Sequence, residues 1–198
     1  VRSQPHPQYA RQPGNIPITS PVSGSGGAAR RNLDDFTRRA GQFDRKVKEK
    51  ESAQFERAVH DSGFGPGHVA VDMGIGTGNA ALPFLEAGGR VFGVELTPAM
   101  AQKGAKRLAE EGFAARALYT IAPAERAPIG CEAADAAVSR NVFHHFADPR
   151  AVFTEMAWTV RPGGHVFVIY FSIPRTRPRG KSSTGLNSFA YPLMFAPW

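Results

Sequence analysis

The residues best suited to chemistry lie where an apolar run ends in a glycine-rich turn. Asp72 stands two residues before Gly74, and Gly76 and Gly78 follow at alternate positions. Glycines let the backbone turn sharply and approach a ligand closely, because no Cβ intervenes. A second acid, Glu95, ends the next apolar run roughly 20 residues after Gly74. A carboxylate at that strand end can accept hydrogen bonds from both hydroxyls of a ribose. The pattern therefore predicts a site for an adenosine-bearing cofactor.

The spacing of the glycines bears on which cofactor binds. A dinucleotide fingerprint requires G-x-G-x-x-G with a pyrophosphate at the helix N-terminus, whereas this chain has G-x-G-x-G. Asp72 would repel a pyrophosphate but suits a cationic group, such as the ammonium of a methionine moiety. The alternative that the glycine motif alone leaves open is a sharp strand-to-helix turn in some other α/β protein.

The run from Asp72 to Gly78 resembles motif I of the class I S-adenosylmethionine-dependent methyltransferases. Three later segments resemble further motifs of the small-molecule members, in the same order: Val91–Met100, Asp135–Pro149 and Arg161–Tyr170. The resemblance covers about residues 36–174. Phe171–Pro174 is similar to a short stretch of the ubiquinone/menaquinone C-methyltransferases. The resemblance implies S-adenosyl-L-methionine as cofactor and methyl transfer to a small-molecule acceptor, with O-, N- and C-methylation all left open.

The resemblance also assigns roles to residues at the strand ends. The glycines pass under the methionine and ribose portion, Glu95 binds the ribose hydroxyls, and Leu96 covers one face of the adenine. Pro123 stands where the family commonly has an acid that accepts from the adenine amino group. The expected cofactor-binding residues are Asp72, Gly74, Gly76, Gly78, Glu95, Leu96, Ala124, Glu125, Arg140 and Asn141.

His144 and His145 are the candidates for a catalytic role, because histidine titrates near neutral pH and can transfer a proton. Adjacent residues point to different sides of a helix or strand, so we expect the two rings to make a poor chelating pair. A structural or pocket-lining role for the pair stays open. No metal site is predicted.

The order of elements predicts the fold. Strands and helices are expected to alternate along the chain. The strands are expected near 68–73, 90–95, 115–119, 135–139 and 165–171. Of the helices between them, one ends at about 87, one spans about 98–111 and one runs from Asp148 to about 158. This alternation predicts an α/β fold with a doubly wound, mostly parallel sheet, the Rossmann-like methyltransferase fold. Ligands of such sheets bind outside the carboxyl ends of the strands.

The ends of the chain differ in composition from its centre. Residues 1–31 are expected to form a disordered basic tail, and 32–174 the methyltransferase domain, with an N-terminal helical lid over about 32–62. Residues 175–198 are expected to be irregular or truncated, supplying at best one irregular strand. The sheet would then lack its usual last two strands and keep an exposed edge.

Composition narrows the functional classes. A length of 198 residues suits one domain, and the single cysteine, Cys131, excludes an intramolecular disulfide and fits a cytoplasmic location. The net charge of +7 raises the possibility of a nucleic-acid partner, but eight of the 24 Lys and Arg residues lie in the two acid-free tails. The centre is nearly neutral, which argues against that partner. No apolar run is long enough for a membrane span. The alternatives that remain are a non-catalytic S-adenosylmethionine-binding module and an NAD(P)-dependent oxidoreductase.

Overall fold

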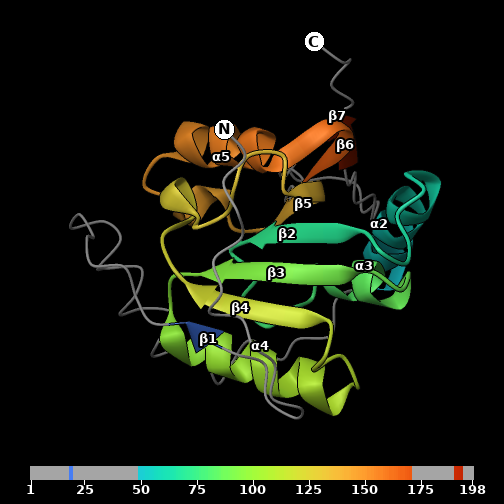
Figure 1. Cartoon of the computed structure of the whole chain (residues 1–198), viewed down its shortest axis with the longest axis horizontal. Helices are drawn as coiled ribbons and strands as arrows, with labels where there is room; N and C mark the ends of the chain where they lie inside the picture. Colours follow the sequence, from blue (N-terminus) through green and yellow to red (C-terminus); the bar gives the residue numbers. More distant parts are fainter. Residues whose placement is uncertain (1–17, 20–48, 171–189, 194–198) are drawn as a thin grey trace, which may run out of the picture.

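The computed structural model describes residues 18–19, 49–170 and 190–193, which form a seven-stranded sheet with helices on both faces (Figure 1). The strand order is β1-β4-β3-β2-β5-β6-β7, and all neighbours are parallel except β6 and β7. The strands are β1 (Ile18–Thr19), β2 (Val69–Met73), β3 (Arg90–Glu95), β4 (Ala117–Ile121), β5 (Ala134–Arg140), β6 (Val160–Ile169) and β7 (Ala190–Leu193).

The described residues also contain four helices and two single 3₁₀ turns. The helices are α2 (Glu49–Asp61), α3 (Leu82–Glu86), α4 (Pro98–Glu110) and α5 (Pro149–Thr159), and the turns are η2 (Ala124–Arg126) and η3 (Phe143–His145). Thr97 occupies the N-cap of α4 ahead of Pro98, although its hydroxyl makes no capping bond. Asp148 caps α5 by accepting from the backbone N–H groups of Arg150 and Ala151 at 3.0 and 3.1 Å, so both expected helix starts are confirmed.

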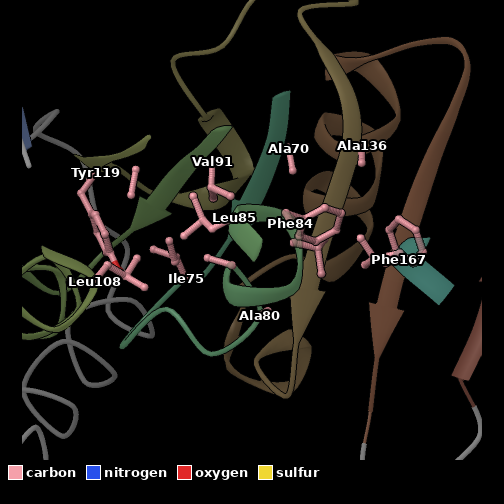
Figure 2. Close-up of a cluster of buried hydrophobic side chains, with 14 of the residues drawn as sticks. Ala70, Ile75, Ala80, Phe84, Leu85, Val91, Leu108, Tyr119, Ala136 and Phe167 are labelled. Carbon is pink, nitrogen blue, oxygen red and sulfur yellow. The ribbon is translucent and has the colours of Figure 1, made fainter. Parts of the chain in front are cut away.

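Successive residues of the strands pack alternately into two hydrophobic cores, one on each face of the described sheet. Side chains at Ala70, Val91 and Ala136 face α2, α3 and α4, and Phe84 and Leu85 of α3 are fully buried among them (Figure 2). The residues between them in the strands, such as Val71 and Ala137, face α5 instead. The period of two is that of a sheet buried on both faces, so the expected doubly wound fold is confirmed.

The topology places a switch point at β2. The chain runs from β2 outward through β3 to β4, and β5 then returns to the other side of β2. The strands β2, β3 and β4 point the same way, so their carboxyl ends meet at one edge (Figure 1). Ligand sites of open α/β sheets form at such an edge.

Several expected boundaries need correction. The first helix after the glycine turn contains only Leu82–Glu86, because residues 74–81 are spent on turns that pass over the strand ends. The third parallel strand begins at Ala117 rather than 115 and runs to Ile121. Residues 161–164, read as a turn before the last parallel strand, lie within β6 as a bulge, with Gly163 at φ 78°. A bulge accommodates extra residues without ending the strand.

The chain ends add two short strands. Within the tail expected to be disordered, the β-branched pair Ile18–Thr19 forms β1 and joins the free edge of β4. At the other end β7 pairs antiparallel with Val166–Ile169, so this part of β6 does not have the exposed edge that we expected. Pro192 in β7 is tolerated because an edge strand need not donate every N–H. The predicted lid helix before residue 49 lies outside the described residues, whereas Phe55 and Val59 of α2 are buried.

Candidate functional site

The glycine turn leaves β2 by folding over the end of β3. The backbone N–H groups of Gly74 and Ile75 both donate to the carbonyl of Val94, at 2.8 and 3.2 Å. Gly74 has φ 79°, and a Cβ there would lie 2.8 Å from the side chain of Val142. Both the left-handed backbone and the close approach require glycine at this position. The turn therefore brings main chain directly against the ends of β3 and β5.

Glu95 ends β3 and ties the turn together. Its Oε2 accepts from the N–H of Gly76 at 2.9 Å, and its Oε1 accepts from the N–H of Thr97 at 2.8 Å. Burial raises the pKa of Glu95, and hydrogen bonds from the backbone and hydroxyl of Thr97 and from the backbone of Gly76 and Leu96 oppose the shift. These bonds fix the carboxylate at the wall of the cleft that it lines.

A cleft opens at the carboxyl ends of β2 to β5. It holds about 550 Å³ of empty space when the solvent at its open mouth is included. All four strand ends contribute to it. Its lining residues are Gly74, Val94, Glu95, Leu96, Thr97, Ala122, Pro123, Ala124, Glu125, Val142, His145, Phe146 and Ala147.

The charged side chains that line the cleft are acidic. Among the described residues that line it, Glu95 and Glu125 are acidic, and none is Lys or Arg. A pyrophosphate needs compensating positive charge or a row of amide donors, whereas two carboxylates favour a ligand that carries positive charge. The cleft therefore fits the sulfonium and ammonium groups of S-adenosylmethionine better than it fits a dinucleotide.

Asp72 lies beside this site rather than in it. Its side chain is completely buried, and neither carboxyl oxygen has a hydrogen-bond partner in the described structure. Burial, assisted by the charge of Glu95 and opposed by that of Arg140, raises the pKa of Asp72 to about 8. A cationic group brought near such a carboxyl would favour its ionised form. An orphaned acid behind the glycine turn thus also fits a cofactor that bears an ammonium.

The opposite wall of the cleft is held by Glu125. From η2, its Oε1 accepts from the backbone N–H of Ala147 at 3.0 Å and, more weakly, from that of Asp148 at 3.4 Å. This contact joins the loop after β4 to the loop after β5, and both loops line the cleft. Pro123 also lines it, so the departure from the family pattern falls at the site itself.

The two histidines behave differently from our expectation. The rings of His144 and His145 lie 3.8 Å apart between centroids, rather than on different sides. Both residues lie in the 3₁₀ turn η3. Only His145 lines the cleft, while His144 is exposed and contacts the ring of Tyr170 edge-on. No group of three metal-ligating side chains occurs in the described residues.

The cleft brings together some of the predicted residues and omits others. Gly74, Glu95, Leu96, Ala124, Glu125 and His145 line it, whereas Asp72, Gly76, Gly78, Arg140, Asn141 and His144 do not. Gly78 serves packing, because a Cβ there would lie 2.9 Å from Leu108 of α4. Asn141 adopts φ 54°, where Asn is tolerated, and its N–H donates to Ile169.

Sequence reasoning missed two kinds of residue. Val142 and Ala147 line the cleft through the loop after β5, and small apolar loop residues carry no motif. Gly104 of α4 was also missed, although a Cβ at this position would overlap the carbonyl oxygen of Gly76 and the hydroxyl of Tyr119. A glycine inside an otherwise regular helix was the one available signal of such an approach.

None of the described helices is both long enough and apolar enough to span a bilayer.

Comparison with known proteins bears on the class of the chain. Residues 71–168 match the family described as a methyltransferase domain. An uncharacterized protein of Mycobacterium tuberculosis is 32% identical over 111 residues, which cover 56% of this chain and 40% of that protein. A ubiquinone/menaquinone biosynthesis C-methyltransferase of Geotalea daltonii is 26% identical over 121 residues, which cover 60% of this chain and 52% of that protein. The chain thus spans about half or less of the length of these curated relatives.

The fold has solved counterparts. A SAM-dependent methyltransferase from Aquifex aeolicus superimposes with a TM-score of 0.61 at 16% identity, covering 73% of this chain and 77% of that one. The sheet defines a Rossmann-like fold, and its cleft opens at the carboxyl ends of the strands. Residues 71–168 belong to the methyltransferase domain family whose model they match, and S-adenosylmethionine-dependent methyltransferases share this fold. S-adenosyl-L-methionine is the cofactor of such methyltransferases.

Proposed function

We propose that this chain transfers a methyl group from S-adenosylmethionine to a small-molecule acceptor. The observation that carries the proposal is Glu95, whose carboxylate is fixed by two backbone amides at the edge of an acidic cleft. Glu95 would hold the ribose hydroxyls, Leu96 and Ala124 would contact the adenine, and the glycine turn would pass the methionine portion. A cytoplasmic location stays a prediction from the single cysteine.

The chemistry needs positioning more than covalent help. When bound, S-adenosylmethionine would supply a methyl group on a sulfonium: an acceptor lone pair would attack the methyl carbon in line, the thioether would leave with the electron pair of the C–S bond, and an O–H or N–H acceptor would lose its proton. The chain's part is to hold both reactants and exclude water. His145 lines the cleft and is the better placed of the two histidines to take that proton.

The charge of the site supports a small acceptor. Among the described residues that line the cleft, no Lys or Arg is present to track a phosphate backbone. The same charges disfavour an NAD(P)-dependent oxidoreductase. A non-catalytic binding module differs from a transferase by binding the cofactor without consuming it.

Isothermal titration calorimetry tests the proposal. The wild-type chain should bind S-adenosylmethionine and S-adenosylhomocysteine but not NADH. Glu95→Gln should weaken both adenosyl ligands by at least about tenfold, because a charged hydrogen-bond partner contributes about 1.5–3 kcal/mol. Glu110→Gln, which changes an exposed carboxylate on α4, is the matched control and should bind like the wild type.

Two results would contradict the proposal. One is a folded wild-type chain that binds neither adenosyl ligand, and the other is NADH binding that survives Glu95→Gln. If the cofactor binds, its conversion to S-adenosylhomocysteine in the presence of candidate acceptors then separates a transferase from a binding module.

A further inference from the structure

The outer side of the glycine turn is held by one side chain of α4. Nη1 of Arg107 donates to Oδ1 of Asn79 at 2.6 Å and to the carbonyl oxygen of Thr77 at 3.3 Å. Its Nε donates to Glu111 at 2.9 Å, which orients the guanidinium from one turn further along the same helix. Arg107 therefore bridges the two residues that flank Gly78, where the backbone has φ 85°.

The same face of α4 packs against the turn at two more points. Gly104 lies three residues before Arg107, and its missing Cβ leaves room for the carbonyl of Gly76. Leu108 is fully buried and fills the space beside Gly78. Residues three and four apart share one face of a helix, so α4 presents a continuous surface to residues 76–79.

The inner side of the turn leads to the cleft. The N–H of Gly76 donates to Glu95, and the carbonyl of Gly76 accepts weakly from the hydroxyl of Tyr119 at 3.4 Å. Glu95 in turn lines the cleft. A shift of the turn on its outer side would therefore move the amide that orients the Glu95 carboxylate.

We propose that Arg107 is a positioning residue that holds the glycine turn in the shape that binds the cofactor. It does not line the cleft, so it acts through Thr77, Asn79 and the Gly76–Glu95 hydrogen bond. This role rests on the proposed function. Without the bridge the turn samples other shapes, and the apparent dissociation constant rises in inverse proportion to the competent fraction. A competent fraction reduced to about one tenth would raise it about tenfold.

Four variants test the role: Arg107→Ala, Asn79→Ala, the double variant, and Lys106→Ala as the matched control. Lys106 neighbours Arg107 on α4, but its side chain is exposed and lies 3.8 Å from that of Glu110. One readout is the dissociation constant of S-adenosylhomocysteine, and the other is deuterium uptake of residues 74–81 without ligand. Thermal melts confirm that each variant is folded at the assay temperature.

Arg107→Ala should raise the dissociation constant about five- to tenfold and speed deuterium uptake in residues 74–81. Asn79→Ala removes the shorter of the two bonds and should shift both readouts in the same direction, and the double variant should add little to Arg107→Ala, because both changes act on one bridge. Lys106→Ala should match the wild type in both readouts. A purely structural Arg107 would lower the melting temperature and leave the affinity of the folded protein unchanged.

The outcomes separate this role from the proposed function. If the wild type binds the ligand and Arg107→Ala binds it equally well, the positioning role is wrong and the proposed function stands. Unchanged deuterium uptake in residues 74–81 also overturns the role. If the wild type does not bind the ligand at all, the proposed function fails, whatever the exchange data show.

Discussion

Replacing Gly104 by alanine tests how tightly α4 packs on the glycine turn. In a helix interior this change ordinarily gains about 1 kcal/mol of stability. Here the new Cβ would overlap the backbone oxygen of Gly76 and the hydroxyl of the buried Tyr119. Neither is the free end of a flexible side chain, so α4 or the turn must move.

The net effect follows from two opposed terms. Overpacking a well-packed site costs about 1–3 kcal/mol, and the helix-propensity gain offsets about 1 kcal/mol of it. Because the overlap involves main chain, we place the cost in the upper part of that range. Gly104→Ala should therefore lower the free energy of unfolding by about 1–2 kcal/mol. For a chain of this size the melting temperature should fall by roughly 2–8 °C.

Thermal and denaturant unfolding measure this effect against a matched glycine. Gly130 is exposed, and the nearest atom to a Cβ there is 4.0 Å away, on Ala133. Gly130→Ala should change the stability by less than about 1 kcal/mol. If Gly104→Ala proves as stable as Gly130→Ala or more so, the inferred contact between α4 and the turn is wrong.

Three further changes test other parts of the structure. The folded-state pKa of Asp72 is about 8, above its ordinary value of 3.8, so the folded chain retains this proton more strongly than the unfolded chain. The free energy of unfolding should thus fall as pH rises from about 4 to 8, by at most about 1.4 kcal/mol per pH unit. In denaturant titrations across that range, Asp72→Asn should lose this pH-dependent part of the stability. A pH profile of Asp72→Asn that matches the wild type would contradict the raised pKa of Asp72. Phe55→Ala should lower the free energy of unfolding by about 3–5 kcal/mol, because Phe55 is buried and packs edge-on to Phe84 with 5.7 Å between the ring centroids. A loss under about 1 kcal/mol in chemical denaturation would contradict the packing of α2 on α3. Glu125→Ala should weaken the binding of S-adenosylhomocysteine severalfold in calorimetry, because the hydrogen bond of Glu125 to Ala147 joins two partly exposed walls of the cleft. The same change should lower the free energy of unfolding by less than about 1 kcal/mol. An unaltered affinity would show that this wall does not shape the site.

The sequence predicted the sheet well because its signals are local. The strands β2 to β5 are short apolar runs bounded by turn residues, and the expected β3 range of 90–95 coincides with the observed one. The bulge at residues 161–164 was not foreseen, because Pro162 and two glycines indicate a turn when read alone. It depends on pairing with β5, which is a long-range contact.

The site was predictable where a motif carries the chemistry. Gly74 and Glu95 stand out by type and spacing, and both line the cleft. The part played by Arg107 was not predictable, because an arginine four residues before Glu111 indicates only an ordinary helix ion pair. Its contacts with Thr77 and Asn79 depend on how α4 crosses the turn, which requires the assembled fold.

The most direct test of the account is a crystal structure of the chain with S-adenosylhomocysteine. The account predicts the adenosyl group in the cleft at the carboxyl ends of β2 to β5, with the ribose hydroxyls within hydrogen-bond distance of the Glu95 carboxylate and the adenine between Leu96 and Ala124. A ligand bound elsewhere on the chain, or one in the cleft whose ribose makes no contact with Glu95, would contradict it.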